Sequence, residues 1–301
     1  RRLLAEPQQL ELTNGRLVFS ALAQGDGPVV LMLHGFPDTL HSWHKQLDAL
    51  AGAGYRAIAV AMRGYEPGSQ PEDGDFSLEA LAGDVVAWLD QLGAEQVHLV
   101  GHDWGAAVAY TVGRDFPERL LSLTTMAVPH SGRFLSEVHR YPRQLRLSWY
   151  MGFFQLRGIA DRVVRRKQFA FLRKLWRDWS PGWDFTDEDF QPVIDAFSQP
   201  DVVKGALAYY RAIPGAMPLG KAARADTRWT IDVPALAITG ADDGCIDTEV
   251  FQALMYAEDF PSGLQLEQLA DAGHFPHLEQ ADVVNALMLD WFAAHSDVNA
   301  G

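Results

Sequence analysis

The sequence has very little cysteine and no long apolar stretch. Cys245 is the only cysteine among 301 residues, so an intrachain disulfide is excluded. No Cys or His stands near it at metal-ligand spacing, and we expect a small apolar residue there. No uncharged apolar run reaches the roughly 18 residues that span a bilayer, which argues against stable membrane insertion. A single cysteine fits a reducing compartment, and we expect a cytoplasmic location.

Positive charge is also scarce. The chain has 25 Lys and Arg against 39 Asp and Glu, which gives a net charge of −14 at pH 7. Because an acidic protein repels phosphate backbones, we expect no nucleic-acid partner. Hydrophobic residues make up 48% of the chain and charged residues 21%, which is typical of a globular protein and argues against disorder.

Apolar runs and amphipathic stretches alternate along most of the chain. A hairpin is expected over residues 8–22, around Asn14-Gly15. Continuous apolar runs predict buried strands at 29–33, 57–61, 97–100, 235–238 and 264–269. Amphipathic stretches predict helices near 42–53, 78–92, 105–116 and 283–292. This order predicts an α/β fold of the α/β-hydrolase kind, with a mostly parallel central sheet flanked by helices.

Residues 131–230 break this alternation and show no buried strand. Between Arg133 and Arg177 there are 12 Lys or Arg and only 2 Asp or Glu, a local charge of +10 in an acidic chain. Aromatic and leucine side chains share this segment, which predicts helices with one apolar and one basic side. We therefore predict a core domain of residues 1–130 and 231–301 with an inserted helical cap of residues 131–230.

Four large apolar residues of this segment recur at helical spacing, namely Phe169, Leu172, Trp176 and Trp179. One interpretation is a basic amphipathic helix that lies on a membrane surface. The other is a cap helix that packs its aromatic side on the core and exposes its arginines to solvent. We favour the second, because such spacing is ordinary in helices of soluble proteins.

The strongest motif is Gly101-His102-Asp103-Trp104-Gly105, between the apolar run 97–100 and the predicted helix 105–116. A strand, a tight turn that glycines allow and a helix form the nucleophile elbow, whose central residue projects above the sheet. That residue is serine in G-x-S-x-G enzymes, but here it is Asp103. A carboxylate is ionised at neutral pH and attacks an sp³ carbon without a base, which gives an alkyl ester. The structural alternative is an Asp that caps the following helix.

A second motif, His34-Gly35-Phe36-Pro37-Asp38, follows the apolar run 29–33 directly. A backbone N–H of this loop would face the elbow across the top of the sheet. Together with the N–H of Trp104 it would form an oxyanion hole. A turn built on glycine and proline is the simpler alternative.

Two further loops supply a candidate base and acid. Ala272-Gly273-His274-Phe275-Pro276 lies between the last strand and the last helix, and His274 would activate water against the ester, with His277 as the alternative. Gly240-Ala241-Asp242-Asp243 also follows a strand, and one of its carboxylates would orient the histidine. Asp247 stays open as a third candidate. The order nucleophile, acid, base is the one expected for this fold.

These motifs together resemble the landmarks of the α/β-hydrolase superfamily, and specifically of its soluble epoxide hydrolases. The likeness also includes Arg63-Gly64-Tyr65 and Val128-Pro129-His130, and it runs from about residue 10 to residue 295. It implies that the acid is Asp243 and that the oxyanion hole uses the backbone of Phe36 and Trp104. By the same resemblance the peptide bond between Phe36 and Pro37 is expected to be cis.

The resemblance further implies two cap tyrosines that hydrogen-bond the epoxide oxygen. The segment Trp149-Tyr150-Met151-Gly152-Phe153-Phe154-Gln155 resembles the first tyrosine motif, which assigns that role to Tyr150. The segment Ala208-Tyr209-Tyr210-Arg211-Ala212 resembles the second and favours Tyr210. Tyr209 is the alternative, since adjacent helical residues point about 100° apart and only one can face the site. Core packing is the ordinary fate of a buried tyrosine.

The expected activity is the conversion of an epoxide to a vicinal diol. Asp103 would form the ester while Tyr150 and Tyr210 donate to the epoxide oxygen, and His274, held by Asp243, would activate the water that hydrolyses it. No metal or organic cofactor is needed. We expect an apolar epoxide and water as the partners, and a homodimer stays open.

Two other functions compete with this one. A haloalkane dehalogenase would use the same relay, with Trp104 as a halide donor. The Phe36 loop and the paired tyrosines favour the epoxide hydrolase, because dehalogenases tend to carry Asn in that loop. A non-catalytic binding protein of this fold would have lost a catalytic residue, whereas here each role has a candidate.

Overall fold

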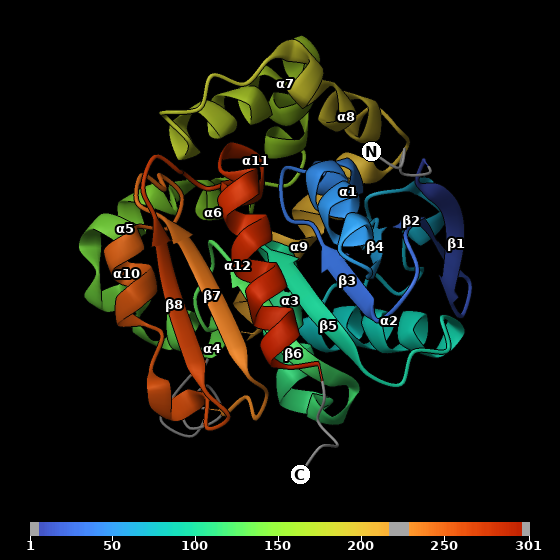
Figure 1. Cartoon of the computed structure of the whole chain (residues 1–301). Helices are drawn as coiled ribbons and strands as arrows, with labels where there is room; N and C mark the ends of the chain where they lie inside the picture. The colour runs from blue at the N-terminus through green and yellow to red at the C-terminus, as the bar shows by residue number, and fades with distance from the viewer. Residues whose placement is uncertain (1–5, 217–228, 297–301) are drawn as a thin grey trace.

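The central element is a sheet of eight strands in the order β1-β2-β4-β3-β5-β6-β7-β8 (Figure 1). It is seen in a computed structural model that describes residues 6–216 and 229–296. The strands are β1 (Gln8–Asn14), β2 (Leu17–Gln24), β3 (Val29–Leu33), β4 (Arg56–Val60), β5 (Val97–His102), β6 (Leu120–Met126), β7 (Ala235–Gly240) and β8 (Leu264–Leu269). The predicted α/β-hydrolase fold is thereby confirmed.

The antiparallel part of the sheet is the predicted hairpin. β1 pairs with β2 from Gln8 opposite Ala23 to Asn14 opposite Leu17, and Gly15 in the turn has a φ of 57°. β2 then pairs antiparallel with β4, whereas the pairs from β4 to β8 are all parallel. The carboxyl ends of the parallel strands therefore meet at one edge of the sheet, where open α/β sheets build their sites.

Helices cover both faces of the sheet, as the alternation of apolar runs predicts. They are α1 (His44–Gly52), α2 (Leu78–Gln91), α3 (Trp104–Asp115), α10 (Thr248–Ala253), α11 (Pro276–Glu279) and α12 (Ala281–Ala294). Successive residues of β3 point to opposite faces: Leu31 belongs to the core cluster that includes residues of α2 and α3, and Met32 to the cluster that includes residues of α1 and α12. Burial on both faces explains why these strands are continuously apolar.

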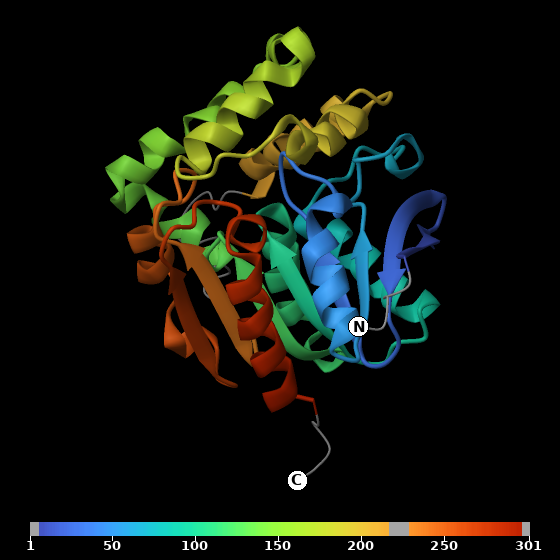
Figure 2. The same cartoon turned by 45° about the horizontal axis from the view of Figure 1, so that its top comes forward.

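The segment between β6 and β7 contains helices joined by loops, and it has no strand in the part that the structure describes. It contains α4 (Ser131–Glu137), α5 (Pro142–Leu147), α6 (Trp149–Phe153), α7 (Ile159–Trp179), α8 (Asp187–Phe197) and α9 (Val202–Ala216). In Figures 1 and 2, α7 and α8 lie above one end of the sheet. Residues 217–228, the end of the predicted cap, lie outside the described residues, and the domain boundaries stay a prediction.

The apolar side of α7 packs inward, as favoured from the sequence. Its four large residues are at most 6% exposed, namely Phe169, Leu172, Trp176 and Trp179. The backbone departs from helical geometry at residues 166–169, so this long element bends near its middle. Over the described residues, no helix combines the length and apolarity needed to cross a membrane.

Candidate active site

Asp103 occupies the sharp turn between β5 and α3. Its φ of 54° and ψ of −120° are outside the regions that most residues adopt, which is the strain expected of a nucleophile elbow. Glycine is required on both sides: a Cβ on Gly101 would lie 2.2 Å from the carbonyl oxygen of Gly105, and one on Gly105 would lie 2.2 Å from that of Leu33. These close approaches hold the carboxylate at the carboxyl edge of the sheet.

Both carboxylate oxygens of Asp103 have partners in the predicted machinery. Oδ2 accepts hydrogen bonds from the backbone N–H of Phe36 at 2.9 Å and of Trp104 at 2.7 Å. Oδ1 lies 2.9 Å from Nε2 of His274. The Phe36–Pro37 peptide bond is cis, as expected. The two N–H groups predicted to form an oxyanion hole therefore converge on one oxygen of the predicted nucleophile.

His274 lies between two carboxylates and is fully buried. Its Nδ1 lies 3.0 Å from Oδ2 of Asp243, on the side opposite Asp103. The backbone N–H of His274 donates to the carbonyl oxygen of Trp179 and to the hydroxyl of Ser180, both just after α7 or at its end. Side chains from the turns or loops after β5, β7 and β8 thus meet in one hydrogen-bonded chain.

The charges of Asp103 and His274 stabilise each other, whereas burial raises the pKa of Asp243 even though His274 and two backbone N–H groups act in the opposite direction. Burial opposes ionisation of Asp103, but the hydrogen bond and positive charge of His274 outweigh it and hold the pKa of Asp103 below its usual value. Burial likewise opposes protonation of His274, yet the charge of Asp243 and hydrogen bonds to both carboxylates raise the pKa of His274 well above its usual value. The resting site therefore pairs an ionised Asp103 with a protonated His274.

The alternative acids have other surroundings. Asp242 is exposed, and Asp247 caps α10 through the N–H of Glu249 and pairs with Arg143. Only Asp243, of the three candidates, contacts the imidazole of His274, and it also accepts hydrogen bonds from two backbone N–H groups, those of Cys245 and Ile246.

The alternative base, His277, lies on the other side of the loop. Its Nε2 is 3.2 Å from the hydroxyl of Ser42, and its ring packs on Trp43 with centroids 4.5 Å apart. It belongs to a buried polar cluster with Asp38 and His102, and His102 Nε2 lies 2.6 Å from the carbonyl oxygen of His274. This cluster was not predicted from the sequence. Its contact with the backbone of His274 supports the loop that carries the histidine.

The adjacent tyrosines of α9 point in different directions. The hydroxyl of Tyr209 donates to the carbonyl oxygen of Arg63 at 2.6 Å, away from the carboxylate. Both rings pack edge-on against Trp104, but the ring of Tyr210 also packs edge-on against Phe36, with centroids 5.0 Å apart. The charge of Asp103 acts on the hydroxyl of Tyr210, whereas Asp84 and Arg63 act on that of Tyr209. Of the two, Tyr210 is therefore the one that borders the site.

Tyr150, on α6, packs edge-on against Tyr210, with ring centroids 5.7 Å apart. Burial, with the negative charge of Asp103 among the further causes, raises the pKa of both hydroxyls well above the usual value. Both tyrosines therefore keep their protons, and a protonated phenol is a hydrogen-bond donor. Two neutral donors from separate helices, α6 and α9, thus lie close enough for the charge of the carboxylate to act on them.

Cys245 is the residue of this site that sequence reasoning missed. It is buried, as expected of a small apolar residue, but its sulfur lies 3.3 Å from the hydroxyl oxygen of Tyr150. Burial raises its thiol pKa to about 11, so the thiol stays protonated at neutral pH. Its position two residues after Asp243 was the available signal, because a residue that close to the acid shares its loop.

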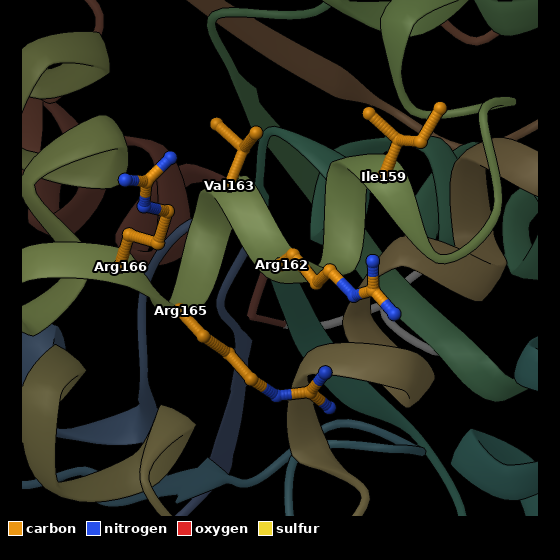
Figure 3. Close-up of a pocket in the computed structure, with 5 residues that line it drawn as sticks. All are labelled: Ile159, Arg162, Val163, Arg165 and Arg166. Atoms are coloured by element: carbon orange, nitrogen blue, oxygen red, sulfur yellow. The ribbon is translucent and has the colours of Figure 1, made fainter.

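A separate surface depression of about 560 Å³ lies on the first half of α7 (Figure 3). It is lined by Ile159, Arg162, Val163, Arg165 and Arg166. None of these residues belongs to the predicted site, and we assign the depression no part in the chemistry.

Comparison with known proteins identifies the class first. The family model for the alpha/beta hydrolase fold matches residues 28–281. Human Epoxide hydrolase 4 is 30% identical over 280 residues, which cover 91% of this chain and 74% of the relative. The AB hydrolase superfamily protein YfhM of Bacillus subtilis is 31% identical over 281 residues. These residues cover 93% of this chain and 95% of the relative.

Solved structures agree with these relatives. A crystal structure of Bacillus megaterium epoxide hydrolase in complex with an inhibitor superimposes with a TM-score of 0.82 at 26% identity. The match covers 95% of this chain and all of the solved one. The chain therefore belongs to the α/β-hydrolase superfamily and, within it, to the epoxide hydrolase family.

Proposed function

We propose that this protein hydrolyses epoxides to vicinal diols through a covalent ester on Asp103. The observation that carries the proposal is the arrangement of one carboxylate. Its Oδ2 meets two backbone N–H donors, while its Oδ1 meets an imidazole backed by a second carboxylate, Asp243. Membership of the epoxide hydrolase family and the named relatives support the same activity.

The first step forms the ester. A carboxylate oxygen of Asp103 attacks one epoxide carbon, the carbon–oxygen bond of the ring breaks, and negative charge develops on the epoxide oxygen. Because an alkoxide is a poor leaving group, the step needs donors where that charge appears. Tyr150 and Tyr210 supply them, and burial keeps both phenols protonated and in an environment of low dielectric.

Ester formation also changes the state of His274. In the resting site the imidazole is protonated because it lies between two negative carboxylates. Once Asp103 is an ester, one of those charges is gone, and the pKa of His274 falls. The imidazole can then release its proton to the newly formed alkoxide, directly or through water, and become a neutral base.

The second step hydrolyses the ester. Neutral His274, oriented through Nδ1 by Asp243, takes a proton from water, and the resulting hydroxide attacks the ester carbonyl carbon of Asp103. The N–H groups of Phe36 and Trp104 stabilise the oxyanion of the tetrahedral intermediate, since they already lie 2.9 and 2.7 Å from a carboxylate oxygen. Collapse of the intermediate breaks the ester bond, and the leaving alkoxide takes a proton from the imidazolium of His274. The carboxylic acid of Asp103 then gives its proton to the imidazole, so the diol leaves and the ionised Asp103 and protonated His274 are restored.

The test is to trap the intermediate. A His274→Ala variant mixed with styrene oxide should accumulate an adduct of one epoxide mass on the peptide that contains Asp103, as read by mass spectrometry. The double variant that also carries Asp103→Ala is the matched control and should show no adduct. Absence of an adduct with a panel of aryl and aliphatic epoxides would contradict the proposal and favour a non-catalytic binding protein.

The rival halide chemistry is separated by product analysis. The wild-type protein should convert styrene oxide to its diol and should release no bromide from 1-bromobutane above the rate of an Asp103→Ala control. Bromide release without diol formation would assign the site to a dehalogenase instead.

A further inference from the structure

Three donor atoms of different kinds converge at the site. A carboxylate oxygen of Asp103, an imidazole nitrogen of His274 and the sulfur of Cys245 lie within 4.8 Å of one another, and all three residues are buried. The proposed hydrolysis uses the first two but gives the thiol no chemical role. The proximity of the thiol to the other two donors is therefore not explained by the proposed hydrolysis.

This combination of donors selects a class of ligand. Thiolate, imidazole and carboxylate are the groups that bind Zn²⁺ tetrahedrally, and thiolate is a soft ligand that Cd²⁺ also favours, whereas Mg²⁺ and Ca²⁺ prefer oxygen ligands alone. Metal–ligand bonds of about 2.0–2.3 Å place tetrahedral donors about 3.3–3.7 Å apart. The present separations, 2.9 Å between Asp103 and His274 and at most 4.8 Å for the others, need only small side-chain rotations to reach that geometry.

The surrounding residues hold two of the donors in place. Asp243 accepts from Nδ1 of His274 and also from the backbone N–H of Cys245 at 2.8 Å, so one carboxylate orients both. The carbonyl oxygen of Cys245 accepts in turn from Nε2 of Gln144 at 2.9 Å. A histidine whose second nitrogen is held by a carboxylate is the outer-shell arrangement common at zinc sites. It leaves Nε2 as the nitrogen available to an ion.

We propose that Asp103, His274 and Cys245 form an inhibitory site for one soft or borderline divalent ion, Zn²⁺ or Cd²⁺. Binding breaks the S–H bond of Cys245 and displaces the proton from Nε2 of His274, and both protons leave to water. The ion gains one bond to each donor, and water completes its coordination. Because the carboxylate then binds the ion, Asp103 cannot attack a substrate. The ion acts here as an inhibitor and has no part in the reaction.

Cadmium titration tests the site directly, because this chain has a single cysteine. We expect the purified, metal-free protein to develop the ultraviolet sulfur-to-cadmium charge-transfer band with a stoichiometry of one. An ion held elsewhere by histidines or carboxylates gives no such band, so the signal reports Cys245 alone. Mg²⁺ is the negative control. Absence of the band at millimolar Cd²⁺ would overturn the proposal.

Variants show whether the three donors act together. Cys245→Ala should abolish the band, and Asp103→Ala should keep it but weaken Cd²⁺ binding. Calorimetric affinity should fall by more than ~100-fold for Cys245→Ala, since even an outer-shell partner is worth about 10–100-fold. Circular dichroism and thermal unfolding verify that each variant folds. An affinity that is the same in wild type and in both variants would place the ion elsewhere and overturn the proposal.

Inhibition is the second measurement, and only this part rests on the proposed function. Zn²⁺ should block epoxide hydrolysis competitively with the epoxide, and EDTA should restore it. Cys245→Ala is compared with its own metal-free rate and should tolerate a Zn²⁺ concentration at least ~100-fold higher than wild type does. A charge-transfer band without inhibition would contradict the proposal that the bound ion prevents Asp103 from attacking the epoxide. A band in a protein that turns over no epoxide would support the ion site while the proposed function fails.

Discussion

The sulfur of Cys245 lies 3.3 Å from the hydroxyl oxygen of Tyr150, and both residues are buried next to the site of Asp103 and His274. A thiol is a weak donor and a weak acceptor, so it holds the hydroxyl of Tyr150 loosely in the resting site, whichever of the two groups donates. An epoxide oxygen that acquires negative charge is a much stronger acceptor. The pair therefore keeps the hydroxyl near its working position without competing strongly with the substrate.

Replacing the sulfur by oxygen should expose this effect. In Cys245→Ser the hydroxyl is a stronger hydrogen-bond partner for Tyr150, and we expect ester formation to slow by roughly 5-fold relative to Cys245→Ala, which corresponds to about 1 kcal/mol of hydrogen bonding. Rapid-quench mass spectrometry of the Asp103 ester measures that step. Hydrolysis of the ester should be equal in the two variants, and equal rates of ester formation would contradict the idea.

The two tyrosines of α9 offer a matched pair of substitutions. Tyr210→Phe removes a donor that borders the carboxylate, and we expect ester formation to fall by ~10²-fold. Tyr209→Phe removes the hydrogen bond to the carbonyl oxygen of Arg63, so it should lower the free energy of unfolding by about 1 kcal/mol and change the rate little. Single-turnover rates and denaturant unfolding of both variants distinguish the two residues. Slow ester formation in Tyr209→Phe and an unchanged rate in Tyr210→Phe would assign the donor role to Tyr209 instead.

Asp242 and Asp243 form a second matched pair. Asp243→Asn leaves a similar shape but removes the charge that stabilises the imidazolium, so turnover should fall by ~10²–10⁴-fold while the ester accumulates. Asp242→Asn changes an exposed side chain and should leave turnover unchanged. Steady-state rates and ester occupancy by mass spectrometry check both results. If only Asp242→Asn lost activity, the acid would be Asp242 and the assignment of Asp243 would be wrong.

Much of this site is readable from the sequence because its signals are local. The elbow is predictable since the apolar run 97–100, two glycines and a helix stand side by side, and the tight contacts of Gly101 and Gly105 follow from that turn. The strands are likewise predictable, because burial on both faces makes each of them continuously apolar. Parallel pairing then brings the loops after different strands to one edge without further information.

Other features depend on how distant elements dock. Whether Tyr209 or Tyr210 borders the site is fixed by the rotation of α9 against the loop of Arg63, which no local pattern encodes. The contact between Cys245 and Tyr150 joins residues 95 positions apart, across the core and the helices above it. The bend of α7 at residues 166–169 also escapes prediction, because the amphipathic pattern continues through it.

Asp38 provides a test by pH of the cluster behind His274. Burial raises its pKa from 3.8 to about 7, although hydrogen bonds from Thr39 and Ser42 act in the opposite direction. The folded protein therefore retains a proton that the unfolded chain releases above pH 3.8. The contribution of Asp38 to the free energy of unfolding is therefore complete below the unfolded pKa of 3.8. It is lost progressively as the pH rises toward 7, the pKa in the folded protein.

Asp38→Asn removes this dependence, since an amide does not titrate. The stability of the variant relative to wild type should therefore increase by about 2–3 kcal/mol between pH 5 and pH 8. His102 and His277 face Asp38 and stay neutral in the folded protein across this window, because burial lowers the pKa of His102 to about 3 and that of His277 well below its usual value. Their protonation in the unfolded chain below pH 6.5 is the same in both proteins and therefore cancels from the difference. Urea unfolding of both proteins at the two pH values measures the difference. A constant difference would mean that Asp38 is ionised in the folded protein and that its charge is balanced inside the cluster.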